Sequence, residues 1–197
     1  PVEELWNAAH ALEEVFHGTP SGIDTGVSLL EGSSLFYPRP PGIPSVKAVT
    51  LPSGWLVIGA VPRTGSTADL VAGIRERWKM DPTGIEDLMQ TLGSISESAC
   101  RLTGAPALVQ LGELADRAQA ILAGLDLSTP AVDDALELLR DNGALGAKLS
   151  GAGGGGAFFG MFQDEPMART AAGVLTEWLG SRPSLPTGPF SLVMSLR

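Results

Sequence analysis

The sequence predicts an α+β protein in which helices pack on a mostly antiparallel sheet. Three observations support this class. After one amphipathic helix, short β-branched and aromatic segments follow one another; four helix-length segments come next; and the order then alternates strand, helix and strand. The chain has 197 residues, of which 44% are hydrophobic, enough to form a substantial core in one domain or two small ones.

The first elements are a helix and three strands. The helix is expected over residues 2–16, because its apolar side chains recur at the spacing of one helix face. Glycine and proline end it in HGTPSG, and DTGVSLL is expected to be a short helix or a loop. Strands in an antiparallel arrangement are predicted at 34–38, 46–51 and 55–61, with the proline-rich PRPPGIP as a connector.

The remainder is mainly helical. Four helices are predicted, and the last begins with a proline and ends on a glycine, as helices often do. Their ranges are 67–80, 84–102, 107–125 and 130–143. A strand at 156–162, a helix at 167–180 and a strand at 190–196 complete the chain.

The charge and the apolar runs exclude some classes of protein. The formal net charge is −9, with 22 acidic and 13 basic residues, which argues against a broad nucleic-acid surface. The apolar runs are shorter than the roughly 18 residues of a membrane span, and PVEELWNAAH lacks the features of a signal peptide. We therefore expect a cytoplasmic protein without a membrane partner. Cys100 is the single cysteine and is expected to be a packed thiol.

A glycine run in KLSGAGGGG is the first candidate site. It comprises Gly151, Ala152, Gly153, Gly154 and Gly155 and precedes the strand at 156–162. Its N–H groups could bind an anion, although the spacing differs from both common phosphate-binding fingerprints. A turn that lets two elements pack closely is the alternative, and composition alone favours that turn.

The second candidate is EEVFHGTPSGID, where a helix leads into a turn. A chain reversal at GTPSG would return Asp24 towards Glu13, so that one carboxylate could take a proton and the other could hold Mg²⁺. A solvated helix face and a turn or cap aspartate are the alternatives. His10 and His17 lie seven residues apart, but two histidines make a poor metal site, and packed or partly exposed helix histidines are expected.

The third candidate is VPRTGSTADLVAGIRERW, at the start of a helix. Ser66 or Thr67 is most simply an N-cap for that helix. The alternative is that a hydroxyl orients a substrate, with help from Arg63 and the helix dipole.

These three motifs occur together and in this order. FHGTPSGID, VPRTGSTADLVAGIRERW and GALGAKLSGAGGGGAFFG closely resemble the mevalonate kinases, which belong to the GHMP family of small-molecule kinases. The resemblance implies that Asp24 is catalytic, that Glu13 is a Mg²⁺ ligand and that residues 151–155 belong to the ATP site. It also implies that His17, Ser21 and Thr67 bind substrate.

The resemblance also implies an architecture and a reaction. Residues 51–197 would form the ferredoxin-like GHMP C-terminal domain, and residues 1–50 a remnant of the N-terminal kinase domain that carries HGTPSGID. The reaction would be phosphorylation of the mevalonate 5-hydroxyl by ATP. Another GHMP kinase, acting on phosphomevalonate, homoserine or a sugar, is the first alternative, and a non-catalytic interaction module is the second.

Two departures from the family pattern qualify these expectations. Additional residues separate Arg63 from Thr67, and Ala68 stands where the family commonly has a basic residue. The chain also lacks the family's N-terminal phosphate loop, PxxxGLGSSAA, and the basic partner of the catalytic aspartate. We therefore expect weak or no turnover from these residues alone, with the N-terminal half supplied in cis or in trans. The resemblance to this family, together with the exposed helices, also implies a homodimer.

Overall fold

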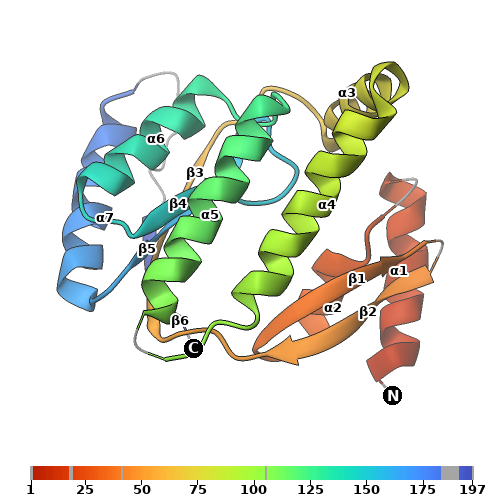
Figure 1. Cartoon of the computed structure of the whole chain (residues 1–197), viewed down its shortest axis with the longest axis horizontal. Helices are drawn as coiled ribbons and strands as arrows, with labels where there is room; N and C mark the ends of the chain where they lie inside the picture. Colours follow the sequence, from red (N-terminus) through yellow and green to blue (C-terminus); the bar gives the residue numbers. More distant parts are fainter. Residues whose placement is uncertain (1, 18–19, 41, 105, 183–190, 197) are drawn as a thin grey trace. The chain divides into compact units, whose positions relative to one another are not determined.

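The computed structural model describes residues 2–17, 20–40, 42–104, 106–182 and 191–196 (Figure 1). They form two compact units, one up to Leu51 and one over Pro52–Leu196. The first contains α1 (Val2–His17), α2 (Ile23–Leu29), β1 (Ser33–Arg39) and β2 (Gly42–Val49). The second contains β3 (Gly54–Val61), α3 (Thr67–Met80), α4 (Pro82–Ala99), α5 (Ala107–Gly124), α6 (Pro130–Asp141), β4 (Gly146–Leu149), β5 (Gly156–Phe162), α7 (Glu165–Gly180) and β6 (Ser191–Leu196).

The first unit consists of a two-stranded antiparallel sheet and two helices. Ser33 pairs with Val49, and the register shifts between Tyr37 and Arg39. Pro38 lies at that shift, where a proline is tolerated because it cannot donate a ladder hydrogen bond. Trp6 of α1 is buried and meets the ring of Phe36 of β1 edge to face, with 6.2 Å between ring centroids. This aromatic pair joins the first helix to the hairpin.

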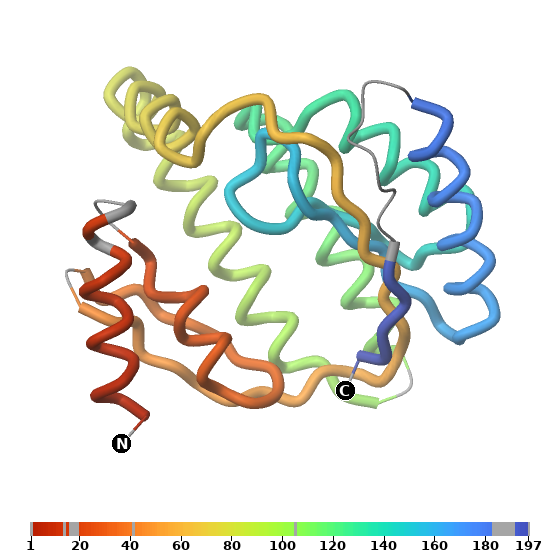
Figure 2. The backbone as a smooth tube through the Cα atoms, turned by 180° about the vertical axis from the view of Figure 1, so that it is seen from behind, coloured from red at the N-terminus to blue at the C-terminus, as the bar shows by residue number. Residues whose placement is uncertain are grey.

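The second unit is built on a four-stranded antiparallel sheet with the order β4-β5-β3-β6. Alternate side chains of its strands point to one face, where they form a buried core with α6 and α7. The largest of these buried side chains are Phe158, Phe162, Leu136, Leu139, Leu149 and Leu175. In Figure 2, β3 and β6 run side by side, as their register of antiparallel pairs requires.

Helix α5 covers the outer edge of β4. The Asp116 carboxylate accepts a hydrogen bond from Ala147 N–H at 3.0 Å, and the buried Gln119 accepts one from Leu149 N–H at 2.9 Å. Arg140 of α6 donates to the same carboxylate at 2.7 Å. A methyl group on Gly112 would overlap the backbone carbonyl of Leu145. Side chains of α5 therefore accept hydrogen bonds from the outer backbone N–H groups of the edge strand β4, which would otherwise be unpaired.

The predicted α+β class with antiparallel sheets is confirmed, but the residue pattern alone suggested one sheet where the structure has two. The strands expected at 34–38 and 46–51 pair with each other, whereas the strand expected at 55–61 belongs to the other sheet. The prediction also missed β4, because only Ala147 and Leu149 give its four residues an alternating pattern. Among the described residues, no helix is both long and apolar enough to cross a bilayer.

Candidate functional site

Asp24 follows a tight turn that is hydrogen-bonded to a side chain of α1. Gly22 is the N-cap of α2 and has φ +70°, a left-handed conformation that favours glycine. Its carbonyl oxygen accepts hydrogen bonds from the Trp6 indole at 2.9 Å, from Gly26 N–H at 3.0 Å and from the Thr25 hydroxyl at 3.2 Å. Three donors on one carbonyl fix the turn immediately before Asp24.

His10 packs against the same turn, one helical turn after Trp6. Its side chain is 5% exposed, and its Nδ1 is a buried atom without a hydrogen-bond partner among the described residues. A methyl group on Gly22 would lie 3.2 Å from that nitrogen and 2.8 Å from Pro44 Cδ. His10 is therefore a packed helix histidine, as expected, and it leaves no room for a side chain at position 22.

The structure places Glu13 and Asp24 on neighbouring elements of the first unit. Glu13 is half-buried and follows Trp6 and His10 on one face of α1, at the spacing i, i+4, i+7. Asp24 is exposed in the first turn of α2. Neither carboxylate has a hydrogen-bond or ion-pair partner among the described residues, so both are available to ligands. The described part of the chain contains no group of three or more His, Cys, Asp or Glu side chains that could hold a metal ion by itself.

Ser21 and His17 are the other predicted residues of this motif, and the structure describes the side chain of Ser21 alone. The Ser21 hydroxyl accepts a hydrogen bond from Ile23 N–H at 3.3 Å, a local turn that leads into α2. The side chain of His17 lies outside the described part of the structure. Trp6 was not among the predicted site residues, and only its helical spacing to His10 indicated a shared face.

The glycine run is a loop between two antiparallel strands, β4 and β5, rather than between a helix and a strand as we expected. Ser150 N–H donates to Ala157 O at 2.8 Å, and Gly154 N–H donates to Leu127 O at 2.8 Å. Gly151 and Gly153–Gly156 all have positive φ, between 68° and 98°. The sequence therefore needs glycine here for its backbone conformation.

Close packing restricts two of these glycines further. A methyl group on Gly153 would overlap the carbonyl oxygen of Leu127, and one on Gly155 would overlap that of Pro62. The segment between β3 and α3 is hydrogen-bonded to the loop, because Thr64 donates from its N–H at 2.8 Å and from its hydroxyl at 3.2 Å to Gly154 O. Figure 2 shows this segment beside the loop.

Thr67 is the first residue of α3, and Ser66 is its N-cap. The Ser66 hydroxyl accepts from Asp69 N–H at 3.1 Å, while the Asp69 carboxylate accepts from both the hydroxyl and the N–H of Ser66. These hydrogen bonds lower the pKa of Asp69. Because Ser66 caps the helix, the Thr67 hydroxyl is left for another role, and it accepts from Arg63 Nη1 at 3.2 Å. Arg63 thus links Thr67 to the glycine loop, because its side chain also lies next to Gly156.

Lys148 lies on β4, two residues before the glycine loop. Its ammonium donates to Leu149 O at 2.6 Å and lies 5.5 Å from the centre of the Phe159 ring. No carboxylate pairs with it among the described residues, and burial lowers its pKa below the ordinary value of 10.5. A partly desolvated positive charge is therefore held close to the loop.

This lowered pKa predicts a pH dependence of stability. The unfolded chain binds a proton on Lys148 more tightly than the folded chain does, so the free energy of unfolding should rise with pH between the lowered pKa and about 10.5. Lys148→Met should abolish that rise in urea unfolding followed at several alkaline pH values. Lys79→Met, which changes an exposed lysine on α3, should retain it. An unchanged profile in Lys148→Met would contradict the prediction.

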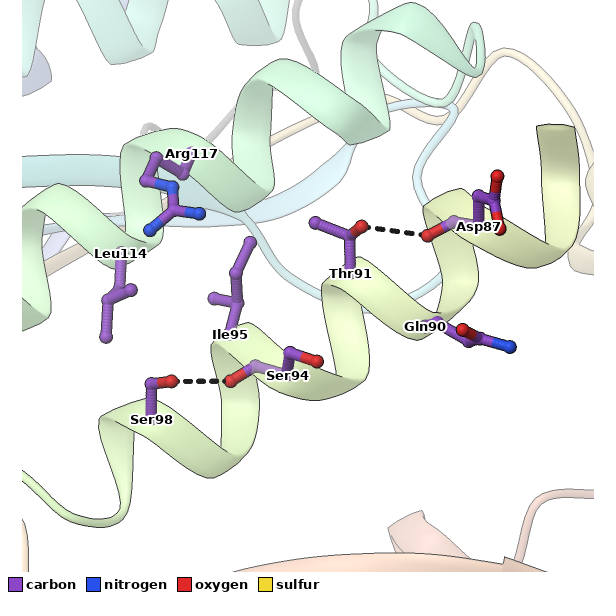
Figure 3. A pocket seen from close by; sticks show the side chains of 8 residues that line it. All are labelled: Asp87, Gln90, Thr91, Ser94, Ile95, Ser98, Leu114 and Arg117. Carbon is purple, nitrogen blue, oxygen red and sulfur yellow. Dashed lines mark hydrogen bonds between the residues drawn. The ribbon is translucent and has the colours of Figure 1, made fainter.

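A groove between α4 and α5 contains none of the predicted site residues. It has a volume of about 330 Å³ and is lined by Asp87, Gln90, Thr91, Ser94, Ile95, Ser98, Leu114 and Arg117 (Figure 3). The hydroxyls of Thr91 and Ser98 donate to carbonyls of their own helix, at 2.8 and 2.7 Å. The predicted site residues of each unit lie outside this groove.

The comparisons with known proteins agree with these motifs. Residues 102–179 match the family described as GHMP kinases C terminal. Mevalonate kinase of Pyrococcus horikoshii is 34% identical over 81% of this chain and 48% of its own length. The crystal structure of L. major mevalonate kinase in complex with R-mevalonate has a TM-score of 0.81 and 25% identity, and covers 98% of this chain and 58% of that chain. Streptococcus pneumoniae phosphomevalonate kinase shares the fold, with a TM-score of 0.70 at 17% identity.

Residues 102–179 therefore carry the GHMP kinase C-terminal domain, within a fold that has antiparallel sheets. Within that family its homologues include the mevalonate kinases, at 30–34% identity in the relatives from Pyrococcus and Thermococcus. The chain spans about half the length of the curated relatives it matches, 48% in the first of them.

Proposed function

We propose that this chain is the C-terminal part of a kinase that transfers the γ-phosphate of ATP to the 5-hydroxyl of mevalonate. The main support is its similarity to curated mevalonate kinases, which extends over 81% of the chain. The residues of each unit support the same reaction. The first unit supplies an exposed and a half-buried carboxylate, neither with a partner among the described residues, and the second supplies the glycine loop.

Phosphoryl transfer depends on positioning and on neutralising charge rather than on covalent chemistry of the protein. The oxygen of the mevalonate 5-hydroxyl attacks the γ-phosphorus of ATP, and the bond to the leaving ADP breaks. Asp24 accepts the proton of that hydroxyl. The turn at Gly22, held by Trp6 and His10, keeps Asp24 in place. Ser21 and His17, which precede that turn in the sequence, contact the substrate in this proposal.

Glu13 is suited to hold Mg²⁺, since its half-buried carboxylate has no partner among the described residues and this ion prefers oxygen ligands. Bound Mg²⁺ would neutralise charge on the ATP phosphates. Residues 151–155 shape the nucleotide site, and Thr67 places the substrate.

A further stretch of polypeptide completes the first unit in this proposal. Trp6 is the one large apolar side chain among its described residues that is buried, and a sheet of two strands is marginally stable alone. Helix α1 exposes an apolar stripe of Val2, Leu5, Leu12 and Val15, with exposed fractions of 52–78%. The N-terminal kinase half, supplied in cis or in trans, would cover this stripe and provide the phosphate loop.

The substrate is tested by ADP release from the full-length gene product in the presence of ATP and Mg²⁺. Mevalonate should give turnover, whereas phosphomevalonate, homoserine and galactose should give less than about a hundredth of its kcat/KM, because a site built for one polar substrate leaves buried groups unpaired with another. Preference for one of the other three would assign a different GHMP substrate. Failure to bind both Mg-ATP and mevalonate in calorimetry would favour a non-catalytic module.

A further inference from the structure

Gly154, within the glycine loop of the second unit, is held from three directions. Its N–H donates to Leu127 O at 2.8 Å, and its carbonyl oxygen accepts from the N–H of Thr64, also at 2.8 Å. A methyl group on Gly154 would lie 3.0 Å from Cδ1 of Leu70, a residue of α3. The position of the loop therefore depends on the turn that contains Leu127 and on the segment that leads into α3.

The turn that contains Leu127 is tied to the far end of α3. Arg77, in the last turn of that helix, donates from Nη1 to Gly124 O at 3.2 Å and forms an ion pair with the Asp126 carboxylate. Both partners lie within three residues of Leu127. No residue of α3 is buried, so this helix depends on such polar contacts more than a helix with a buried apolar face does.

Asp126 has a backbone conformation that most residues avoid. Its φ is 57°, and it is the one non-glycine residue with a positive φ in the part of the chain that the structure describes. The N–H of Leu127 donates to Leu122 O at 3.0 Å, a hydrogen bond of the helix C-terminal motif in which glycine usually occupies the position of Asp126. Glycine would adopt this φ at lower cost, but it would not supply the carboxylate that pairs with Arg77.

We propose that Arg77 is a positioning residue of the nucleotide site, which holds the glycine loop in place through the turn at 124–127. This inference rests on the proposed function, where the loop is assigned to the ATP site. Arg77 fixes the turn, and the turn fixes Gly154 through the carbonyl oxygen of Leu127. The same helix carries Thr67 at its other end, so α3 links the residue assigned to the substrate with the loop assigned to the nucleotide.

Hydrogen exchange of single amides in the full-length gene product, without ligand, tests the structural link. Arg77→Ala should speed exchange at Gly154 and Thr64 about three- to ten-fold, as expected when a partly exposed ion pair and one hydrogen bond are lost. Ser150, whose N–H pairs with the opposite strand, should keep its parent rate. Arg75→Ala, at an exposed arginine of the same helix, is the matched control and should change none of these rates.

Asp126→Gly separates positioning from stability. It removes the ion pair but relieves the left-handed strain, so the thermal midpoint should stay unchanged or rise while the Gly154 amide exchanges faster. In this variant and in Arg77→Ala, the KM for ATP should rise about three- to ten-fold, while kcat and the KM for mevalonate stay within about two-fold of the parent values. Arg77→Lys should recover part of the loss, and the double variant should be no worse than Arg77→Ala, because both changes break one link.

Three results would overturn the proposal. They are parent-like exchange of the Gly154 amide in Arg77→Ala, an unchanged KM for ATP in an active enzyme whose loop exchanges faster, and an Asp126→Gly midpoint clearly below that of the parent. The exchange experiment needs neither ATP nor mevalonate. Faster exchange would therefore establish the link from Arg77 to the loop even if the kinase assignment failed, and an absence of kinase activity would count against the proposed function alone.

Discussion

Replacing Asp24 by asparagine in the full-length gene product should lower kcat for ADP release with mevalonate by about 10² to 10⁴-fold, the usual contribution of a general base. Asparagine keeps the size and shape of the side chain but cannot accept the hydroxyl proton. Asp24 is exposed and has no partner among the described residues, so the variant should fold as the parent does. Coupled ADP-release kinetics measure the loss, and thermal unfolding checks the fold.

Asp141→Asn is the matched control, because Asp141 is also exposed and lies at the end of α6, outside the three predicted motifs. Its kcat should stay within about two-fold of the parent value, as surface substitutions normally have small effects. A kcat of Asp24→Asn that equals the parent value would exclude Asp24 as the base. If the 197 residues alone gave robust turnover that Asp24→Asn abolished, the expected need for an N-terminal half would be refuted.

Local signals in the sequence predicted the helices well. Asp81, Thr129 and Asp164 each cap a helix through the side chain, and a proline follows each of them in the first turn. The helix expected from residue 84 begins at Pro82 because the Asp81 cap precedes it. Such signals lie within a few residues of the helix end, so a single sequence contains them.

Pairing between distant parts of the chain could not be predicted in the same way. Strand β4 depends on Asp116 and Gln119 of α5, which bind its backbone from about 30 residues away. An apolar pattern shows that a segment is a strand but not which strand it pairs with, so the pattern alone did not predict the division into two sheets. The contact of Arg63 with Gly156 likewise joins residues far apart in the sequence.

The candidate site residues show the same difference between what local sequence signals predict and what only the structure reveals. Residue types, their order and the family resemblance named Glu13, Asp24, Thr67 and the glycine run as candidates, and their roles stay predictions. The sequence left open whether the glycines serve packing or binding, and the structure shows that the packing requirement is real at Gly153 and Gly155. It also shows unpaired N–H groups, among the described residues, at Gly151 and its neighbours. The two interpretations therefore apply to different groups of one loop and do not exclude each other.

Gly155→Ala should be the most damaging single substitution in that loop. Gly155 has φ +98°, and a methyl group there would overlap the carbonyl oxygen of Pro62 and lie 3.0 Å from Arg63 Cα. Left-handed strain and overpacking together should cost about 2 to 4 kcal/mol, because the contacts are with backbone that cannot rotate away. For a chain of this size, the unfolding midpoint should fall by about 5 to 15 °C.

The end of β3 would have to move away from the loop to relieve that overlap, and Arg63 would move with it. Differential scanning calorimetry gives the midpoint, and loss of the hydrogen bond from Thr64 to Gly154 should appear as faster exchange of the Thr64 amide proton. Gly73→Ala is the matched control, since Gly73 lies in α3 with nothing within 4 Å of an added methyl group. It should leave the midpoint unchanged or raise it, because alanine favours a helix by about 1 kcal/mol over glycine. A Gly155→Ala midpoint equal to that of the parent would show that the loop and the end of β3 separate freely, and the tight packing inferred between them would be wrong.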